Sequence, residues 1–268
     1  MLAAFAVVLA AAFVVAPGTL AASRPGGGFA DQFSLVETLG KAFVEYWRSG
    51  DRDLSPSLER VVDYWFRYHV AKAVIAAILL IVLVVLGVLL WRAFLRAGAL
   101  GAGRRAALAS AGVLVTMPAL FSLMVVMANV QGAVAPFASL LSLLPVGASD
   151  GVLADTFDQV RQRLAESAAA GHRTPPALEV MISDYALYHV TLVVIGSIVA
   201  VVLIGMSIVL WRRSARTGSS DRRTRRVLRS FGVLSTVLSL IMIVVVAANM
   251  TNVADPAPAL LALFDGGR

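Results

Sequence analysis

The chain has no cysteine, and it lacks several of the short motifs that mark common enzymes. The absence of cysteine excludes disulfides, thiolate metal sites and cysteine nucleophiles. Neither a P-loop nor an HExxH zinc motif occurs, and the sequence indicates no enzyme class. Acidic, basic and histidine side chains are also missing from the middle of each long apolar run. Because pumps and ion relays need ionisable groups at that depth, this absence disfavours a secondary transporter.

Apolar residues are abundant instead, and they gather in blocks. Hydrophobic residues make up 59% of the chain, with a mean hydropathy of +0.83, against about 45–50% in soluble domains. Four runs reach the roughly 20 residues that a bilayer-spanning helix needs: Val70–Leu90, Ala107–Ala128, Val190–Leu210 and Val227–Ala248. The sequence therefore predicts an all-α membrane protein with four transmembrane helices.

A fifth apolar run, Leu2–Ala16, is shorter and stops at Pro17-Gly18. Its length suits a signal-peptide core, and small residues follow it. We expect cleavage after Ala21 or Ala22, or retention of residues 1–22 as a short N-terminal anchor. Retention would leave the N-terminus inside, and cleavage would remove it.

The chain repeats itself after 120 residues. Tyr68-His69-Val70 aligns with Tyr188-His189-Val190, and 31 of the 86 positions from Pro56 to Leu141 are identical at this offset without a gap. Each copy contains two apolar runs, which predicts two tandem hairpins in the same orientation. They would be related by a pseudo-two-fold axis along the membrane normal. The predicted boundaries are 23–144 for the first repeat and 145–268 for the second.

Basic residues gather in the turns of both hairpins, 92–106 and 212–226, which carry a single acid, Asp221. Short basic loops stay in the cytoplasm, so both turns are predicted to lie inside and the C-terminus outside a plasma membrane. The second turn is the denser, and we assign topology and possible lipid-headgroup contact to its arginines: Arg212, Arg213, Arg222, Arg223, Arg225 and Arg226. A nucleic-acid partner is not expected from so short a turn.

The segments outside the hairpins have helical periodicity. Apolar residues recur at steps of three and four in both copies, at Phe29, Phe33, Val36, Leu39, Phe43 and Trp47, and at Leu153, Phe157, Val160 and Leu164. New helices are expected to begin at Pro56 and Pro176 and to run unbroken to Trp91 and Trp211. Short interfacial helices are expected at Pro136–Leu144 and Pro256–Phe264. The predicted amphipathic faces need burial on each other, on the outer ends of the spans, on the lipid interface or on a partner.

Two Tyr-His pairs open the first run of each copy, at Tyr68-His69 and Tyr188-His189. The two imidazoles could meet across the pseudo-two-fold axis and share a haem iron, a copper or zinc ion, or a proton. The alternative is a polar interfacial collar that bonds headgroups or the neighbouring copy. No HxxxH motif or adjoining carboxylate cluster adds further ligands, so no cofactor is the simpler expectation.

Asn129 and Asn249 close the second run of each copy. They are predicted to cap helix ends or to bond between helices; lining a cavity at the outer rim is the functional alternative.

Three stretches resemble uncharacterised multi-pass membrane proteins of high-GC actinobacteria: Leu90-Trp91-Arg92-Ala93-Phe94, Val130-Gln131-Gly132-Ala133-Val134-Ala135-Pro136 and Ser219-Ser220-Asp221-Arg222-Arg223. The resemblance implies the topology but no activity, substrate or cofactor.

The leading interpretation is therefore an accessory or scaffold protein that presents extracytoplasmic helices to an envelope partner or to a second copy. A small protein that binds a cofactor, metal or lipid through His69 and His189 is the alternative, and a channel or transporter comes third.

Overall fold

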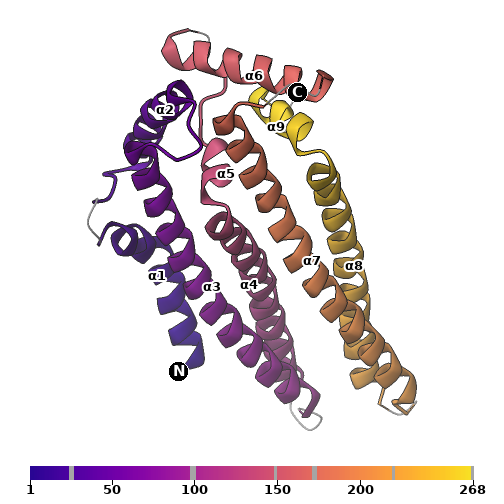
Figure 1. The fold of residues 1–268 in the computed structure, drawn as a ribbon. Helices are drawn as coiled ribbons and strands as arrows, with labels where there is room; N and C mark the ends of the chain where they lie inside the picture. The colour runs from indigo at the N-terminus through magenta and orange to yellow at the C-terminus, as the bar shows by residue number, and fades with distance from the viewer. Residues whose placement is uncertain (24–26, 97–100, 148–149, 171–173, 219–220, 267–268) are drawn as a thin grey trace. The chain divides into compact units, whose positions relative to one another are not determined.

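This computed structural model describes residues 1–23, 27–96, 101–147, 150–170, 174–218 and 221–266, and all regular secondary structure among them is helical. The predicted all-α class is therefore confirmed. Figure 1 shows the helices, which follow in the order α1 (Leu2–Ala22), α2 (Gln32–Ser49), α3 (Pro56–Arg96), α4 (Ala102–Val134), α5 (Pro136–Leu141), α6 (Val152–Ala170), α7 (Pro176–Arg216), α8 (Arg222–Ala254) and α9 (Pro256–Phe264).

Five of these helices, α1, α3, α4, α7 and α8, are long and apolar enough to cross a membrane. The four predicted runs lie inside the last four of them. Helices α3 and α7 each contain 41 residues, so the prediction that they run unbroken from Pro56 and Pro176 is confirmed. The chain is a multi-pass membrane protein by the length and hydropathy of its helices.

Helix α1 differs from the prediction, because it continues through Pro17-Gly18 to Ala22. A proline inside a helix costs about 3 kcal/mol relative to alanine, so the last turn needs support from elsewhere. Ala21 supplies it, since its side chain is fully buried in an apolar core. Its carbonyl oxygen also accepts a hydrogen bond of 3.0 Å from Arg67 Nε on α3. The first apolar segment is therefore a fifth candidate span.

The described residues form two compact units. The first unit comprises Met1–Val14, Ala73–Met127 and Val193–Ala248, and the second comprises Val15–Lys72, Ala128–Leu192 and Asn249–Arg268. Helices α1, α3, α4, α7 and α8 contribute residues to both, whereas α2, α5, α6 and α9 belong to the second alone.

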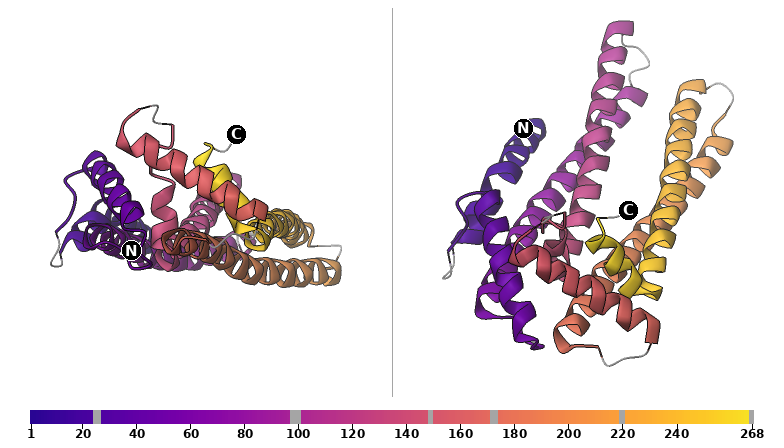
Figure 2. Two further views of the ribbon diagram at one scale, coloured as in Figure 1. Left: turned by 45° about the horizontal axis from the view of Figure 1, so that its top comes forward. Right: turned by 90° about the horizontal axis from the view of Figure 1, so that it is seen from above.

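In the first unit, α3 lies beside α4 and α7 lies beside α8 (Figures 1 and 2). A tryptophan joins each pair in the same way. Trp91 Nε1 donates to Thr116 Oγ1 at 3.4 Å, and Trp211 Nε1 donates to Thr236 Oγ1 at 3.5 Å. Gly112, one turn before Thr116, lets the indole approach, because an added Cβ would lie 2.8 Å from the Trp91 ring.

The second unit has an apolar core that α2, α6 and α9 close. Figures 1 and 2 show α6 lying alongside α9. Phe43, Phe157 and Phe264, one from each helix, pack with ring centroids 5.8–6.2 Å apart and are fully buried. Tyr46 is buried beside them, and its hydroxyl donates to the Ala177 carbonyl oxygen at 3.2 Å. Burial raises the pKa of Tyr46 to about 12, so it stays a neutral donor at physiological pH.

Local sequence explains where α2 begins and ends. Asp31 accepts a hydrogen bond from the Ser34 amide, and the Ser34 hydroxyl accepts one from the Asp31 amide, which completes a capping box. Gly50 ends the helix with a φ of 68°, a left-handed conformation that suits glycine.

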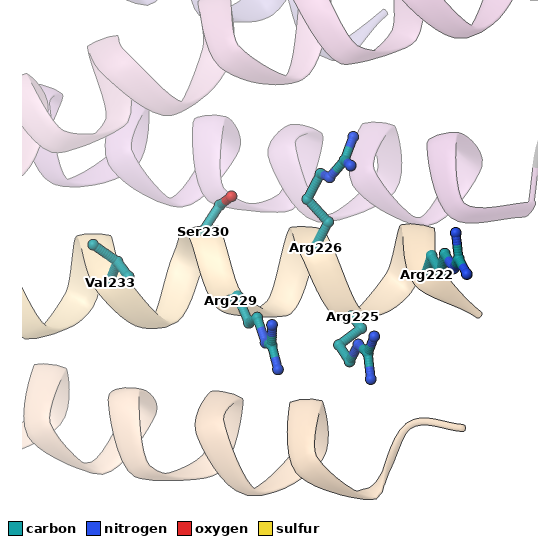
Figure 3. A pocket seen from close by; sticks show the side chains of 6 residues that line it. All are labelled: Arg222, Arg225, Arg226, Arg229, Ser230 and Val233. Atoms are coloured by element: carbon teal, nitrogen blue, oxygen red, sulfur yellow. The ribbon is translucent and has the colours of Figure 1, made fainter. Parts of the chain in front are cut away.

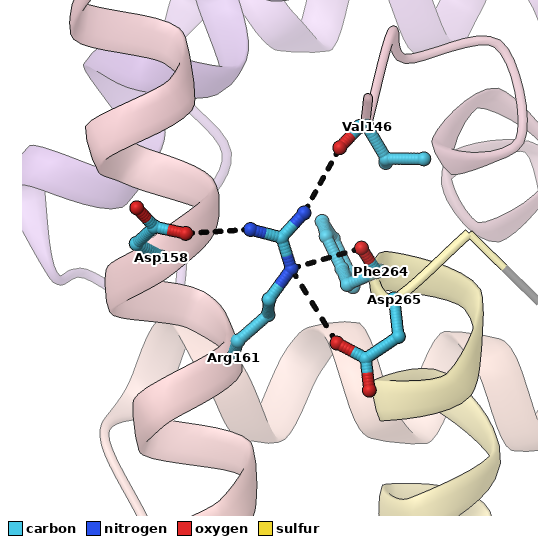
Figure 4. A network of polar contacts seen from close by, with 5 residues as sticks. All are labelled: Val146, Asp158, Arg161, Phe264 and Asp265. Atoms are coloured by element: carbon cyan, nitrogen blue, oxygen red, sulfur yellow. Dashed lines mark hydrogen bonds and ion pairs between the residues drawn. The ribbon is translucent and has the colours of Figure 1, made fainter. Parts of the chain in front are cut away.

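Arg161 of α6 ties three segments of the second unit together (Figure 4). Its guanidinium donates to the carbonyl oxygens of Phe264 and Val146, both at 2.9 Å. It also lies 2.6 Å from Asp158 and 3.5 Å from Asp265. The side chain thus supplies a hydrogen-bond donor at the C-terminus of α9, where the last carbonyl oxygens have no partner within the helix.

Most residues of the predicted amphipathic faces lie in this core or pack against it, but Phe33 and Val36 do not. Leu39, Phe43, Phe157, Val160 and Leu164 are buried, as expected. Phe33, by contrast, is 77% exposed. Phe29 precedes α2 rather than lying in it, and its ring packs against Tyr64 with the centroids 4.9 Å apart. The sequence also indicates a turn at Gly171-His172-Arg173, which lies outside the described residues.

Candidate functional site

Each predicted histidine bonds to the predicted asparagine of its own hairpin. His69 Nδ1 of α3 lies 3.0 Å from Asn129 Oδ1 of α4, and His189 Nδ1 of α7 lies 2.7 Å from Asn249 Oδ1 of α8. Both pairs belong to the second unit. An asparagine oxygen only accepts, so each contact is a hydrogen bond when Nδ1 carries the ring proton, and a neutral ring then has its lone pair on Nε2. Both asparagines lie inside their helices, so the helix-cap alternative is wrong and the interhelical bond is confirmed.

The first pair is packed tightly against the backbone of α4. A Cβ added at Gly132 would meet the His69 ring at 2.7 Å, at Nε2 and Cε1. Nε2 is buried and has no hydrogen-bond partner among the described residues. The ring also meets Trp65 edge-on, with centroids 4.8 Å apart. The ring is thus held between the Asn129 side chain and the α4 backbone at Gly132.

In the second pair, an asparagine lies beside the histidine where the first pair has a glycine. The position of Gly132 in the first copy is taken by Asn252 in the second, and Asn252 Nδ2 lies 3.5 Å from His189 Nε2, the nitrogen that can accept from it when Nδ1 carries the proton. The Tyr185 ring lies 4.6 Å from the imidazole centroid. An amide therefore stands where the first copy has only a glycine backbone.

Each predicted tyrosine ring meets the following histidine edge-on, with centroids 5.9 Å apart for Tyr68–His69 and 5.5 Å apart for Tyr188–His189. Tyr68 stacks on Trp65 with centroids 5.2 Å apart, and Lys72 Nζ lies 4.9 Å above its ring. The Tyr188 carbonyl oxygen accepts from Gln131 Nε2 at 3.0 Å. Within the part of the chain that the structure describes, no hydrogen bond or ring contact joins His69 to His189. Across the described ranges no group of three or more metal-ligand side chains is found.

Two polar residues that the sequence did not single out position helices here. Gln131 is buried and joins α4 to α7 through the Tyr188 carbonyl. Asp184 of α7 accepts from the Ala138 amide in the first turn of α5, at 2.7 Å. Burial raises the pKa of the Asp184 carboxyl, although this hydrogen bond acts in the opposite direction. No periodicity marks either residue, because each bonds to a backbone group far away in the sequence.

Residues 147–151 have the GxSxG spacing of a hydrolase nucleophile elbow. That motif requires a strand before the serine and a helix after it. The neighbouring described elements are the helices α5 and α6, so the structural context of the motif is lacking, and Ser149 itself lies outside the described residues.

An apolar groove opens on the second unit between α2 and α6. It is lined by Phe33, Val36, Glu37, Gly40, Lys41, Val44, Pro145, Val152 and Leu153. Gly40 brings the two helices close, since an added Cβ would lie 3.3 Å from Leu153 Cδ2. The two charged residues pair with each other, Lys41 Nζ to Glu37 Oε1 at 2.7 Å. The groove is thus electrically neutral.

The predicted arginines of the second turn remain a cluster in the structure. Figure 3 shows a cavity on α8 in the first unit, lined by Arg222, Arg225, Arg226, Arg229, Ser230 and Val233. Arg212 and Arg213 belong to α7 and do not line it. The geometry thus separates the six predicted arginines into two groups.

No known protein family, curated protein or solved structure matches this chain.

Proposed function

We propose that the chain is an integral-membrane accessory or scaffold protein whose second unit is presented on the outer side of the membrane to a partner in the cell envelope. One observation carries this proposal: the second unit has a closed aromatic and aliphatic core instead of an open polar cleft over the histidines. The His69 ring abuts Gly132 and bonds to Asn129. These contacts suit a rigid helical body better than a cofactor site.

In this proposal the two halves, 23–144 and 145–268, are tandem repeats. Contacts that recur 120 residues apart support it. Trp65 Nε1 donates to Ser139 Oγ at 2.7 Å, and at the matching positions Tyr185 Oη donates to the Ala259 carbonyl at 3.3 Å. The histidine–asparagine and tryptophan–threonine bonds recur in the same way.

The proposed orientation places both hairpin turns in the cytoplasm and the C-terminus outside. The arginines of the turns support it through the preference of short basic loops for the inside. Helix α1 is then a retained anchor with its N-terminus inside. The burial of Ala21 and its bond from Arg67 support retention, since cleavage after Ala21 or Ala22 would cut at this packed end.

The partner is an envelope protein with an apolar, uncharged segment that lies in the groove between α2 and α6. Apolar exposure supports this location: Phe33 is 77% and Val152 51% exposed. Because Glu37 and Lys41 neutralise each other, the groove offers no charge to attract an acidic or basic peptide.

A photoreactive phenylalanine analogue at Phe33 is expected to form one discrete adduct with another protein in native membranes. The same analogue at Arg60, an exposed residue of α3, is the control and should form none. Val152→Glu should abolish the Phe33 adduct, because a buried unpaired charge disrupts an apolar contact. Adducts identical at both positions, or none at Phe33, would contradict the proposal. An adduct with a second copy would replace the envelope partner by self-association.

A further inference from the structure

We propose that the first turns of α8, together with Arg105 of α4, bind the phosphate headgroup of an anionic phospholipid, and that an acyl chain of the lipid lies along the exposed apolar face of α8. All of these residues belong to the first unit. The inference concerns a lipid site and is independent of the proposed envelope partner.

The arginines form a cavity and not only a charged run. Figure 3 shows Arg225 and Arg229 pointing to one side of α8 and Arg226 to the other. A second cavity shares Arg222 and Arg226 and is completed by Phe94, Arg105, Arg223 and Val227. Because the two cavities share two arginines, they are adjacent, and guanidinium groups from α4 and α8 converge there. Guanidinium is the side-chain group that best matches phosphate oxygens.

Little on the protein neutralises this charge. The ion pairs among the described residues involve none of these arginines. Asp221 is the acid of the turn, and it accepts from the Thr224 amide at 3.0 Å as the cap of α8. Hydrogen bonds from Thr224 lower the pKa of Asp221. Arg223 lies over the Phe94 ring at 5.8 Å, which orients it without removing its charge.

The apolar continuation of the same face distinguishes a lipid from a free phosphate. Beyond Arg225 and Arg229, which point to the same side of α8, the steps of three and four continue along the helix through Val233, Val237, Leu240 and Val244, which are all exposed. From Arg229 to Leu240 the helix rises about 16 Å at 1.5 Å per residue. This is about half of the roughly 30 Å hydrocarbon core, the depth of one leaflet.

The test titrates the detergent-purified full chain with phosphatidylglycerol or with phosphatidylcholine and counts bound lipids by native mass spectrometry. We expect tighter binding of phosphatidylglycerol. The double variant Arg226→Gln/Arg229→Gln should weaken it about 20-fold, since each basic residue near an anionic lipid contributes roughly fivefold. The matched control, Arg212→Gln/Arg213→Gln, removes the same charge from the same turn and should weaken it less than about twofold.

Equal losses in the two double variants would overturn the site, because they would show diffuse attraction to net charge. Equal binding of the two lipids by the unaltered chain would overturn it as well. Inorganic phosphate is added in a further arm. If it displaced the lipid completely at equal concentration, the apolar face would contribute nothing and the lipid assignment would fail.

Discussion

Phe43→Ala is expected to lower the free energy of unfolding of the second unit by about 3–5 kcal/mol, the usual cost of truncating a buried phenylalanine. The Phe43 ring is fully buried between Phe157 and Phe264. Its removal leaves a cavity where α2, α6 and α9 meet. Other contacts hold these helices in place, so they cannot move freely to fill the cavity. The measurement is the thermal unfolding midpoint of the purified chain, followed by tryptophan fluorescence.

Phe33→Ala is the matched control, because it is the same substitution on the same helix. The Phe33 side chain is 77% exposed, so the free energy of unfolding should change by less than about 0.5 kcal/mol. A large loss from Phe33→Ala, or none from Phe43→Ala, would show that the core of the second unit is misassigned.

Gly132→Ala is expected to destabilise the chain by about 1–3 kcal/mol, the cost of overpacking a tight contact. The new Cβ would lie 2.7 Å from the His69 ring, so α3 and α4 must separate or the ring must turn away from Asn129. Gly205→Ala is the control, because nothing lies within 4 Å of a Cβ there. That change should stabilise α7 by about 0.5–1 kcal/mol.

The double variant Gly132→Ala/His69→Ala separates the clash from a general helix effect. Removing the imidazole makes room for the methyl group, so the two changes should couple by at least about 0.5 kcal/mol in a double-mutant cycle. Strict additivity would show that His69 does not pack on Gly132.

The features of this chain that the sequence predicts are those that depend on local patterns of apolar residues and proline. The long helices α3 and α7 follow from apolar runs continuous with Pro56 and Pro176, and α9 begins and ends as the sequence indicates at Pro256 and Phe264. The interhelical role of Asn129 is one of three alternatives that the sequence leaves open, and the length of α4 and the bond to His69 favour it.

The unpredicted features depend on distant contacts. Pro17 marks the end of a helix in local terms, yet the burial of Ala21 carries α1 beyond it. Nothing in the local sequence distinguishes Gly132 from other small residues, because its role depends on the His69 ring that packs against it from α3. Arg161 sits on a charged face in the sequence, but the carbonyl oxygens of Phe264 and Val146 engage it from two other segments.

The most direct measurement of the central claim is cysteine accessibility in intact cells, with four single-cysteine variants at Asp51, Gly103, Asp150 and Gly218. The chain has no cysteine of its own, so each introduced thiol reports on one position alone. Two same-orientation hairpins with cytoplasmic turns predict that a membrane-impermeant maleimide labels the thiols at 51 and 150 at once. Those at 103 and 218 should react only after permeabilisation. Labelling that places 103 and 218 on opposite sides of the membrane would contradict the account.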